Sequence, residues 1–174
     1  MQVGKHFVGG VGQGGRFLPL GGVGDGWRVA MNTLMYERGV STLGQQIRYA
    51  RELSGIVALA RDNGSIDDPL IRERLTRAWV GLRAMRSYAL ATMDVEKPGQ
   101  DNISKLLWAN WHRDLGELAM DVMGKDSLTL EGDFNEWQRL FLFSRADTIY
   151  GGSNEIQRNV LAERVLGLPR EVKG

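Results

Sequence analysis

The sequence DPLIRERLTRAWVGLRAMRSYALAT, from Asp68 to Thr92, shows a clear helical pattern in this chain of 174 residues. Asp68 is a favourable N-cap residue, and Pro69 takes the first helical position, where its missing N–H is not needed. Apolar side chains then recur at helical spacing, at Ile71, Leu75, Trp79, Leu82, Met85 and Ala89. This spacing predicts an amphipathic helix with one apolar stripe, and Pro98-Gly99 is expected to end the region.

The segment before it is predicted to form one long helix, from Asp25 to about Arg61. Its apolar residues recur at three- and four-residue spacing or multiples of it: Trp27, Ala30, Met31, Leu34, Ile47, Ala50, Ile56 and Val57. Asn63-Gly64-Ser65 is expected to end this helix. Asp67-Asp68 is interpreted as a capping pair rather than a metal site.

Further helices are predicted after Gly99. The next one has an apolar stripe formed by Ile103, Leu107, Trp111, Leu115, Leu118 and Val122. A shorter helix is expected over about 135–146, with Trp137, Leu140 and Phe141 facing inward. The last helix is expected over about 153–166, capped by Ser153 and stopped by Gly167 and Pro169.

The expected fold class is all-α, an up-and-down bundle of three long and two shorter helices over residues 21–170, with a tail at 171–174. No segment alternates with period two over a useful length, so no sheet is predicted. Residues 1–20 are expected to be irregular, because the first 26 residues hold ten of the 23 glycines. The stretch Gly10-Val-Gly-Gln-Gly-Gly15 formally matches G-x-G-x-x-G, so a phosphate loop is the alternative. Pro19 argues against the helix that such a loop requires.

The composition excludes several classes of function. The chain has no cysteine, which excludes disulfides and thiolate metal sites, and its two histidines, His6 and His112, exclude a histidine-rich metal site. A net charge of +1 gives no case for nucleic acid or an anionic membrane. No apolar run approaches the roughly 20 residues of a membrane span. We therefore expect a cytoplasmic protein without metal, and interpret His112 as a helix-surface or interface residue without a catalytic role.

Several motifs resemble the C-terminal helical domain of acyl-CoA dehydrogenases. The start of that domain is similar to Gly24-Asp-Gly-Trp27 and Leu34-Met-Tyr-Glu37-Arg38, and its third helix is similar to Lys105-Leu-Leu-Trp108 and Gly116-Glu-Leu-Ala119. Its closing segment resembles Tyr150-Gly-Gly-Ser-Asn-Glu-Ile-Gln-Arg-Asn159 followed by Ala162-Glu-Arg-Val-Leu-Gly-Leu-Pro-Arg170. The resemblance covers about Gly21 to Arg170, and the closing motif is long and specific.

This resemblance implies bound FAD, an acyl-CoA substrate and oxidation to a 2-enoyl-CoA. A carboxylate removes the proton next to the thioester carbonyl, and hydride passes to the flavin. A homotetramer or dimer, or a hetero-oligomer with a paired dehydrogenase subunit, is implied as well. The family normally has an N-terminal helical domain and a middle β-domain before this bundle, so we expect the chain to be a C-terminal piece.

The catalytic base departs from the usual family pattern. Many members carry glutamate directly after the tyrosine of the closing motif, where this chain has Gly151. Glycine cannot remove a proton, but its N–H can donate to a thioester oxygen. A second subgroup places the base on the first long helix as the glutamate of a Glu-Arg pair, which Glu37-Arg38 matches. Glu37 is therefore expected to be the base, with Arg38 supporting it; a surface glutamate paired with a neighbouring cation is the alternative.

The resemblance also implies flavin contacts. It places Ser153 and Glu155 against FAD at the start of the last helix, with simple capping as the alternative for Ser153. Arg61 falls near a family arginine that reaches the FAD pyrophosphate across a subunit interface, although Asp62-Asn-Gly-Ser-Ile66 departs from the usual pattern there. A helix-end cation is the alternative for Arg61.

Three functional hypotheses follow. The chain belongs to a dehydrogenase whose base is Glu37, to a non-catalytic partner subunit used for assembly or flavin binding, or is by itself an inactive oligomerising bundle. Gly151 favours the second hypothesis. An acyl-CoA oxidase is a variant of the first, distinguished by transfer of the electrons to oxygen, and the acyl chain cannot be read from the sequence.

Overall fold

The computed structural model describes residues 8–11, 17–19, 22, 24–30, 42–93, 97–130 and 132–170. The chain divides into two compact units, Met1–Val40 and Ser41–Gly174. The first unit contains an antiparallel pair of short strands, β1 (Val8–Val11) and β2 (Phe17–Pro19), and helical residues at 26–30.

The prediction of no sheet is wrong for this first segment. Val8 pairs with Pro19 and Val11 pairs with Phe17, with an irregularity in the register between them. Strands of four and three residues are too short for period-two alternation to be visible in the sequence. A second strand, rather than a helix, follows the glycine-rich stretch, which removes the context that a phosphate loop requires.

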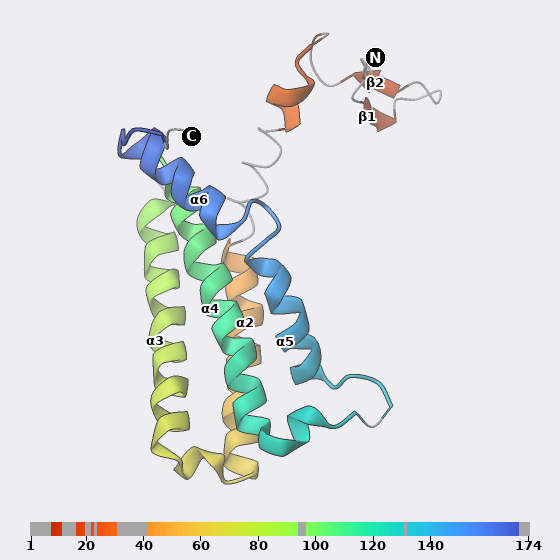
Figure 1. Ribbon diagram of the computed structural model, residues 1–174, viewed down its shortest axis with the longest axis vertical. Coiled ribbons are helices and arrows are strands. Elements are labelled where there is room, and N and C mark those ends of the chain that lie inside the picture. Colours follow the sequence, from red (N-terminus) through yellow and green to blue (C-terminus); the bar gives the residue numbers. More distant parts are fainter. Residues whose placement is uncertain are drawn as a thin grey trace. The chain divides into compact units, whose positions relative to one another are not determined.

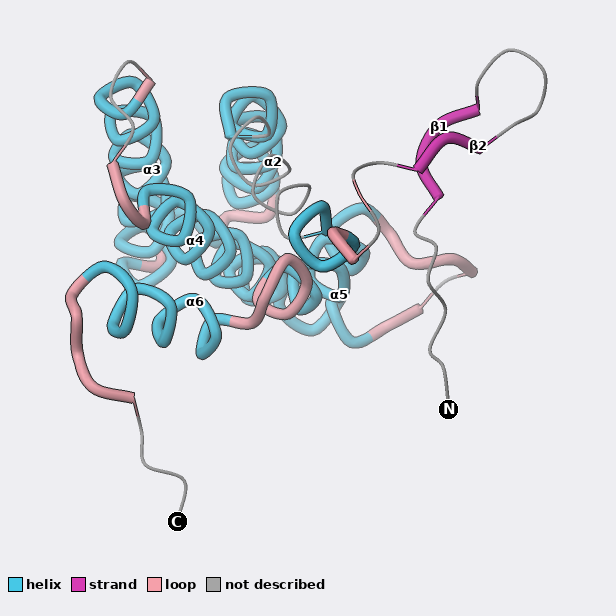
Figure 2. Tube along the Cα trace, turned by 90° about the horizontal axis from the view of Figure 1, so that it is seen from above, coloured by secondary structure: helices cyan, strands magenta, loops and turns pink. Residues whose placement is uncertain are grey.

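The second unit is an up-and-down helical bundle, and the predicted all-α fold class is confirmed (Figure 1). Its upright helices are α2 (Thr42–Asp62), α3 (Pro69–Thr92), α4 (Gln100–Met123) and α5 (Glu136–Asp147). Helix α6 (Asn154–Val160) continues into a π-helical turn over Leu161–Val165. Seen along the bundle, α6 lies across the end at which α4 begins (Figure 2). Short 3-10 turns, η1 (Ser65–Asp67) and η2 (Gly124–Leu128), follow α2 and α4.

The predicted helix ends agree with the observed capping. The Asp68 carboxylate accepts a hydrogen bond from the Leu70 N–H at 2.8 Å, and Pro69 begins α3. Ser153 caps α6 by accepting from the Ile156 N–H at 3.5 Å. The first long helix was predicted from Asp25 to about Arg61, and α2 ends one residue later at Asp62. Residues 31–41, which join the helical residues at 26–30 to α2, lie outside the described part.

Helix α4 is the centre of the bundle, because it packs against α2, α3, α5 and α6. Its contact with α5 requires Gly116. A Cβ atom at this position would lie 2.6 Å from the Ser144 hydroxyl oxygen and 3.0 Å from the Phe141 Cα. The core of the bundle consists of Tyr49, Leu53, Ile56, Ala60, Ile71, Leu75, Leu82, Met85, Trp108, Ala109, Leu115, Leu118, Ala119, Val122 and Leu140.

The predicted inward face is wrong for the first half of α4. Ile103 and Leu107 are 36% and 42% exposed, whereas Lys105 and His112 are both 1% exposed. Both polar side chains hydrogen-bond to Asp147 of α5, and His112 also to Glu52 of α2, and these partners cannot be read from a pattern of apolar residues. Trp79 and Ile47 of the predicted stripes are likewise exposed. None of the helices among the described residues is long and apolar enough to cross a membrane.

Candidate functional site

The turn from Tyr150 to Ser153 joins α5 to α6 and contains two consecutive left-handed residues. Gly151 has φ +65° and Gly152 has φ +96°, a region that costs L-residues roughly 1–2 kcal/mol. A Cβ atom at Gly151 would lie 3.9 Å from the Lys105 Cε, which is ordinary van der Waals contact. The backbone conformation, rather than lack of space, therefore favours glycine at position 151.

Buried Gln157 holds the carbonyl side of this turn. Its side-chain amide donates to the carbonyls of Gly151 and Gly152, at 2.8 and 3.2 Å. Its amide oxygen accepts from Asn102 of α4 at 2.5 Å. Within the described residues, the Gly151 N–H donates no hydrogen bond. The turn is thus fixed through its carbonyls, while the Gly151 N–H has no hydrogen-bond partner among the described residues.

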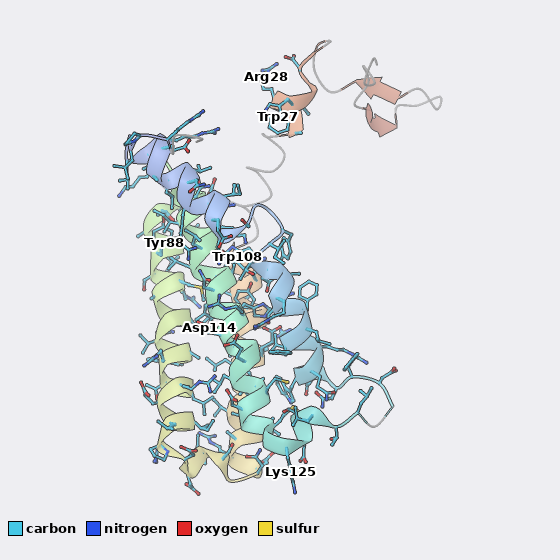
Figure 3. The ribbon with its side chains drawn as sticks, in the orientation of Figure 1. Trp27, Arg28, Tyr88, Trp108, Asp114 and Lys125 are labelled. Carbon is cyan, nitrogen blue, oxygen red and sulfur yellow. The ribbon has the colours of Figure 1, made fainter. Side chains whose placement is uncertain are left out.

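Tyr150 fixes the other side of the turn. Its hydroxyl donates to the Asp147 Oδ1 at 2.5 Å, and its ring lies 6.1 Å from the ring of Trp108, which Figure 3 labels on α4. The buried Lys105 ammonium donates to the Asp147 carbonyl and lies 5.9 Å from the Tyr150 ring and 5.2 Å from the Trp108 ring. A buried cation beside Gly151 favours negative charge developing at this turn.

His112 lies at the centre of a buried charged cluster, and the interpretation of it as a helix-surface residue is wrong. Its Nδ1 faces the Asp147 Oδ2, and its Nε2 lies 2.9 Å from the Glu52 Oε2. Burial lowers the pKa of His112, but the hydrogen bonds to Asp147 and Glu52 outweigh it and leave the pKa raised. A signal existed in the sequence: His112 follows Trp108 by four residues and precedes Leu115 by three, so it shares their buried face.

The structure brings Gly151, Ser153 and Glu155 together at the start of α6. Glu155 is exposed, and the pKa of its carboxyl is lowered by hydrogen bonds from its own N–H and from the Ser153 hydroxyl. The Asn154 N–H donates to the Thr148 carbonyl at 3.2 Å. The capping role of Ser153 is therefore observed, and the first amides of α6 already have partners inside the chain.

Arg61 does not lie with these residues. It is exposed in the last turn of α2, at the end of the bundle opposite the Tyr150–Ser153 turn (Figure 1). Within the described part of the chain it forms no ion pair. Glu37 and Arg38 lie outside the described residues, so their roles stay predictions. No group of metal-ligating side chains of the size a metal ion needs occurs among the described residues.

The sequence profile of the family described as "Acyl-CoA dehydrogenase, C-terminal domain" matches residues 24–166. The chain therefore belongs to this family. The match begins before Ser41 and so includes part of the first compact unit.

Close relatives carry the same family name. The chain is 78% identical over 158 residues to Acyl-CoA dehydrogenase IpdE1 of Mycolicibacterium smegmatis, covering 90% of this chain and 40% of that protein. It is 76% identical over 161 residues to the Mycobacterium tuberculosis protein of the same name, covering 90% of this chain and 42% of that protein. The chain thus spans about two fifths of the length of these relatives.

Solved structures show the same fold. The complex titled "Tcur3481-Tcur3483 steroid ACAD" superposes with a TM-score of 0.74 at 24% identity, covering 90% of this chain and 44% of that chain. The glutaryl-coenzyme A dehydrogenase–glutaryl-CoA complex gives a TM-score of 0.71 at 18% identity, covering 88% of this chain and 42% of that chain. At these identities the likeness concerns the fold.

Proposed function

We propose that this chain is the C-terminal domain of an FAD-dependent acyl-CoA dehydrogenase, which oxidises an acyl-CoA thioester to its 2-enoyl-CoA. The observation that carries the proposal is the Tyr150–Ser153 turn. It presents the Gly151 N–H, unpaired within the described residues, from a backbone held on both sides. The whole protein is proposed to act as a homo-oligomer or with a paired dehydrogenase subunit.

The Gly151 N–H is proposed to donate to the thioester oxygen. Removal of the neighbouring proton places negative charge on that oxygen, and a fixed donor aimed at it lowers the barrier and typically raises the rate by a factor of about 10²–10³. Gln157 and Tyr150 hold the turn before substrate arrives, so little reorganisation is needed. The Lys105 ammonium adds positive potential beside the same turn.

Glu37 is proposed to remove the proton, with Arg38 supporting its carboxylate. Position 151 offers no carboxylate, so the base must come from elsewhere in the assembled site. A carboxylate placed in a desolvated site has a raised pKa and is a stronger base towards a weakly acidic carbon. The support for Glu37 is the Glu-Arg pair in the segment that the family profile covers.

The residues present fit FAD. An exposed arginine without an ion pair inside the described chain suits a pyrophosphate, which makes Arg61 the proposed phosphate ligand. Ser153 and Glu155 are proposed to contact the flavin where the Tyr150–Ser153 turn meets α6. Arg61 ends α2 at the end of the bundle opposite the Tyr150–Ser153 turn, and we propose, as the resemblance implies, that it contacts the pyrophosphate of an FAD held across a subunit interface. Bound flavin supplies the hydride acceptor.

The test is turnover of acyl-CoA thioesters of short, medium and long chain by the complete flavoprotein that contains this chain. Glu37→Gln should remove most of the turnover while the protein keeps its bound flavin. Glu73→Gln is the matched control, because Glu73 is an exposed carboxylate paired with Arg77 on α3. Full activity of Glu37→Gln would refute the assignment of the base.

The second candidate is a non-catalytic partner subunit that serves assembly or flavin binding. Gly151 favours it, because the glycine lacks the usual carboxylate and its φ of +65° disfavours any replacement. Solved structures with the same fold include the two-component complexes titled Tcur3481-Tcur3483 and ChsE4-ChsE5. Co-purification of a second, carboxylate-bearing dehydrogenase chain would favour this candidate, and a self-sufficient active homotetramer would exclude it.

The 174-residue chain by itself is proposed to oligomerise without turnover, because it spans about two fifths of its relatives. Purification of this chain alone as a yellow protein active on an acyl-CoA would contradict that expectation.

A further inference from the structure

A buried charged cluster lies directly beneath the Tyr150–Ser153 turn, and the proposed chemistry does not use it. It joins three helices through Glu52 of α2, His112 of α4 and Asp147 at the end of α5. The His112 and Asp147 side chains are 1% and 0% exposed, whereas Glu52 is 22% exposed. Burying ionisable groups costs desolvation free energy. A structural or functional role for this cluster would explain why that cost is tolerated.

The cluster must hold one proton more than a neutral histidine provides. A neutral imidazole has one N–H donor and one acceptor nitrogen, yet both nitrogens of His112 face carboxylate oxygens. An imidazolium donates to both carboxylates and leaves no lone pair facing an oxygen. The raised pKa of His112, in which the bonds to Asp147 and Glu52 outweigh burial, agrees with this state.

Asp147 connects the histidine to the turn. Its Oδ2 takes the His112 bond, its Oδ1 accepts the Tyr150 hydroxyl at 2.5 Å, and its carbonyl accepts the Lys105 ammonium. Tyr150 directly precedes Gly151. Movement of the Asp147 carboxylate would therefore be transmitted through one phenol to the residue whose N–H we assign to the thioester oxygen.

Other charged or titratable groups surround the cluster. From α2, Arg48 reaches Glu52 at 3.4 Å, and the Tyr49 ring lies 4.5 Å from the His112 ring. Burial, and then the charge of Asp147, raises the pKa of the Tyr49 phenol, so Tyr49 stays neutral. From α4, Lys105 faces the Asp147 carbonyl. The proton of His112, whose pKa is raised, is therefore the one whose loss would change the contacts of Asp147.

We propose that His112 is a positioning residue for the oxyanion donor: its imidazolium fixes Asp147, and thereby Tyr150, so that the Gly151 N–H points at the thioester oxygen only while His112 is protonated. This inference rests on the proposed function, since it gives the turn its ligand. Loss of the proton leaves one imidazole nitrogen against a carboxylate oxygen, the Asp147 carboxylate moves, and the turn loosens.

Tyr150→Phe separates this role from simple support of the bundle. In the wild-type flavoprotein, kcat should fall as the pH rises through the pKa of His112. Tyr150→Phe should lower kcat, by less than the ~10²–10³ that complete loss of an oxyanion donor costs, and abolish this alkaline decrease, because the turn is no longer bonded to the Asp147 carboxylate, while flavin binding remains. Tyr88→Phe is the matched control, since it also removes one tyrosine hydrogen bond, to the Gln100 carbonyl at 3.3 Å. An unchanged alkaline decrease in Tyr150→Phe would overturn the proposal.

Hydrogen–deuterium exchange of the peptide covering residues 148–153 gives a readout that does not depend on turnover. After correction for the intrinsic pH dependence of exchange, the wild-type turn should lose protection as the pH rises, and Tyr150→Phe should have low protection at every pH. Protection that does not vary with pH would refute the positioning role even in an active enzyme. If no acyl-CoA is turned over but protection varies as expected, the proposed function fails and the His112–Tyr150 coupling stands.

Discussion

Replacing Asp147 by asparagine removes one charge from the buried cluster while keeping the size of the side chain. Asp147 is fully buried, and both of its carboxylate oxygens are used, by His112 and Tyr150. Removing one partner of a buried pair typically costs 3–5 kcal/mol, because the other charge stays buried and unpaired. Asparagine can still accept the Tyr150 hydroxyl, and His112 can become neutral, so we expect a loss of about 3 kcal/mol in the free energy of unfolding.

The same substitution should change how stability depends on pH. In the wild type the folded pKa of His112 is raised, so folding retains a proton that the unfolded chain has lost. The contribution of His112 to stability is complete below its unfolded pKa of about 6.5 and disappears as the pH rises through the folded pKa. In Asp147→Asn this decrease should be much smaller, because the imidazolium has lost one of its two carboxylate partners.

Urea unfolding followed by circular dichroism at about pH 6 and about pH 9 measures both effects. Asp121→Asn is the control, because Asp121 is 53% exposed and pairs with Arg74 on the surface of the bundle. Such exposed pairs contribute at most about 1 kcal/mol. A loss below about 1 kcal/mol for Asp147→Asn, or a pH dependence equal to that of the wild type, would refute the reasoning about the buried pair.

Further substitutions test packing, backbone and flavin contacts. Gly116→Ala should lower the free energy of unfolding by about 1–3 kcal/mol, because its Cβ would meet the Ser144 hydroxyl at 2.6 Å. At Gly44 an added Cβ would meet no atom within 4 Å, so Gly44→Ala should stabilise α2 by about 0.5–1 kcal/mol. Equal melting temperatures for Gly116→Ala and Gly44→Ala would contradict this account. Gly151→Ala should cost about 1–2 kcal/mol from its positive φ and reduce kcat; an unchanged melting curve would show that the turn adopts another conformation. Arg61→Ala should weaken FAD binding without changing stability, compared with exposed Arg139→Ala as control, and equal flavin retention would refute the assignment.

The sequence predicts those parts of the fold that depend on local chemistry. Asp68 followed by Pro69 marks the start of α3, and Ser153 marks the start of α6, because capping is decided by a few neighbouring residues. The family could be identified because its closing motif is long. The short β1–β2 pair was missed, because its strands are too short to show a period.

The candidate site was less predictable because its partners are distant in the sequence. His112 meets Glu52 across 60 residues and Asp147 across 35, and nothing at position 112 alone indicates either partner. Lys105 and Asn102 were missed for the same reason: their burial is compensated by bonds to the chain from Asp147 to Gln157. The role of Glu37 stays a prediction, since it rests on the resemblance and lies outside the described residues.

Anaerobic mixing of the complete flavoprotein with an acyl-CoA deuterated at the carbon next to the thioester carbonyl tests the central claim most directly. We predict that acyl-CoA reduces the flavin in a single turnover, that deuterium slows this reduction, and that Glu37→Gln abolishes it while flavin stays bound. Absence of flavin reduction by every acyl-CoA chain length tested, or full reduction in Glu37→Gln, would contradict the account.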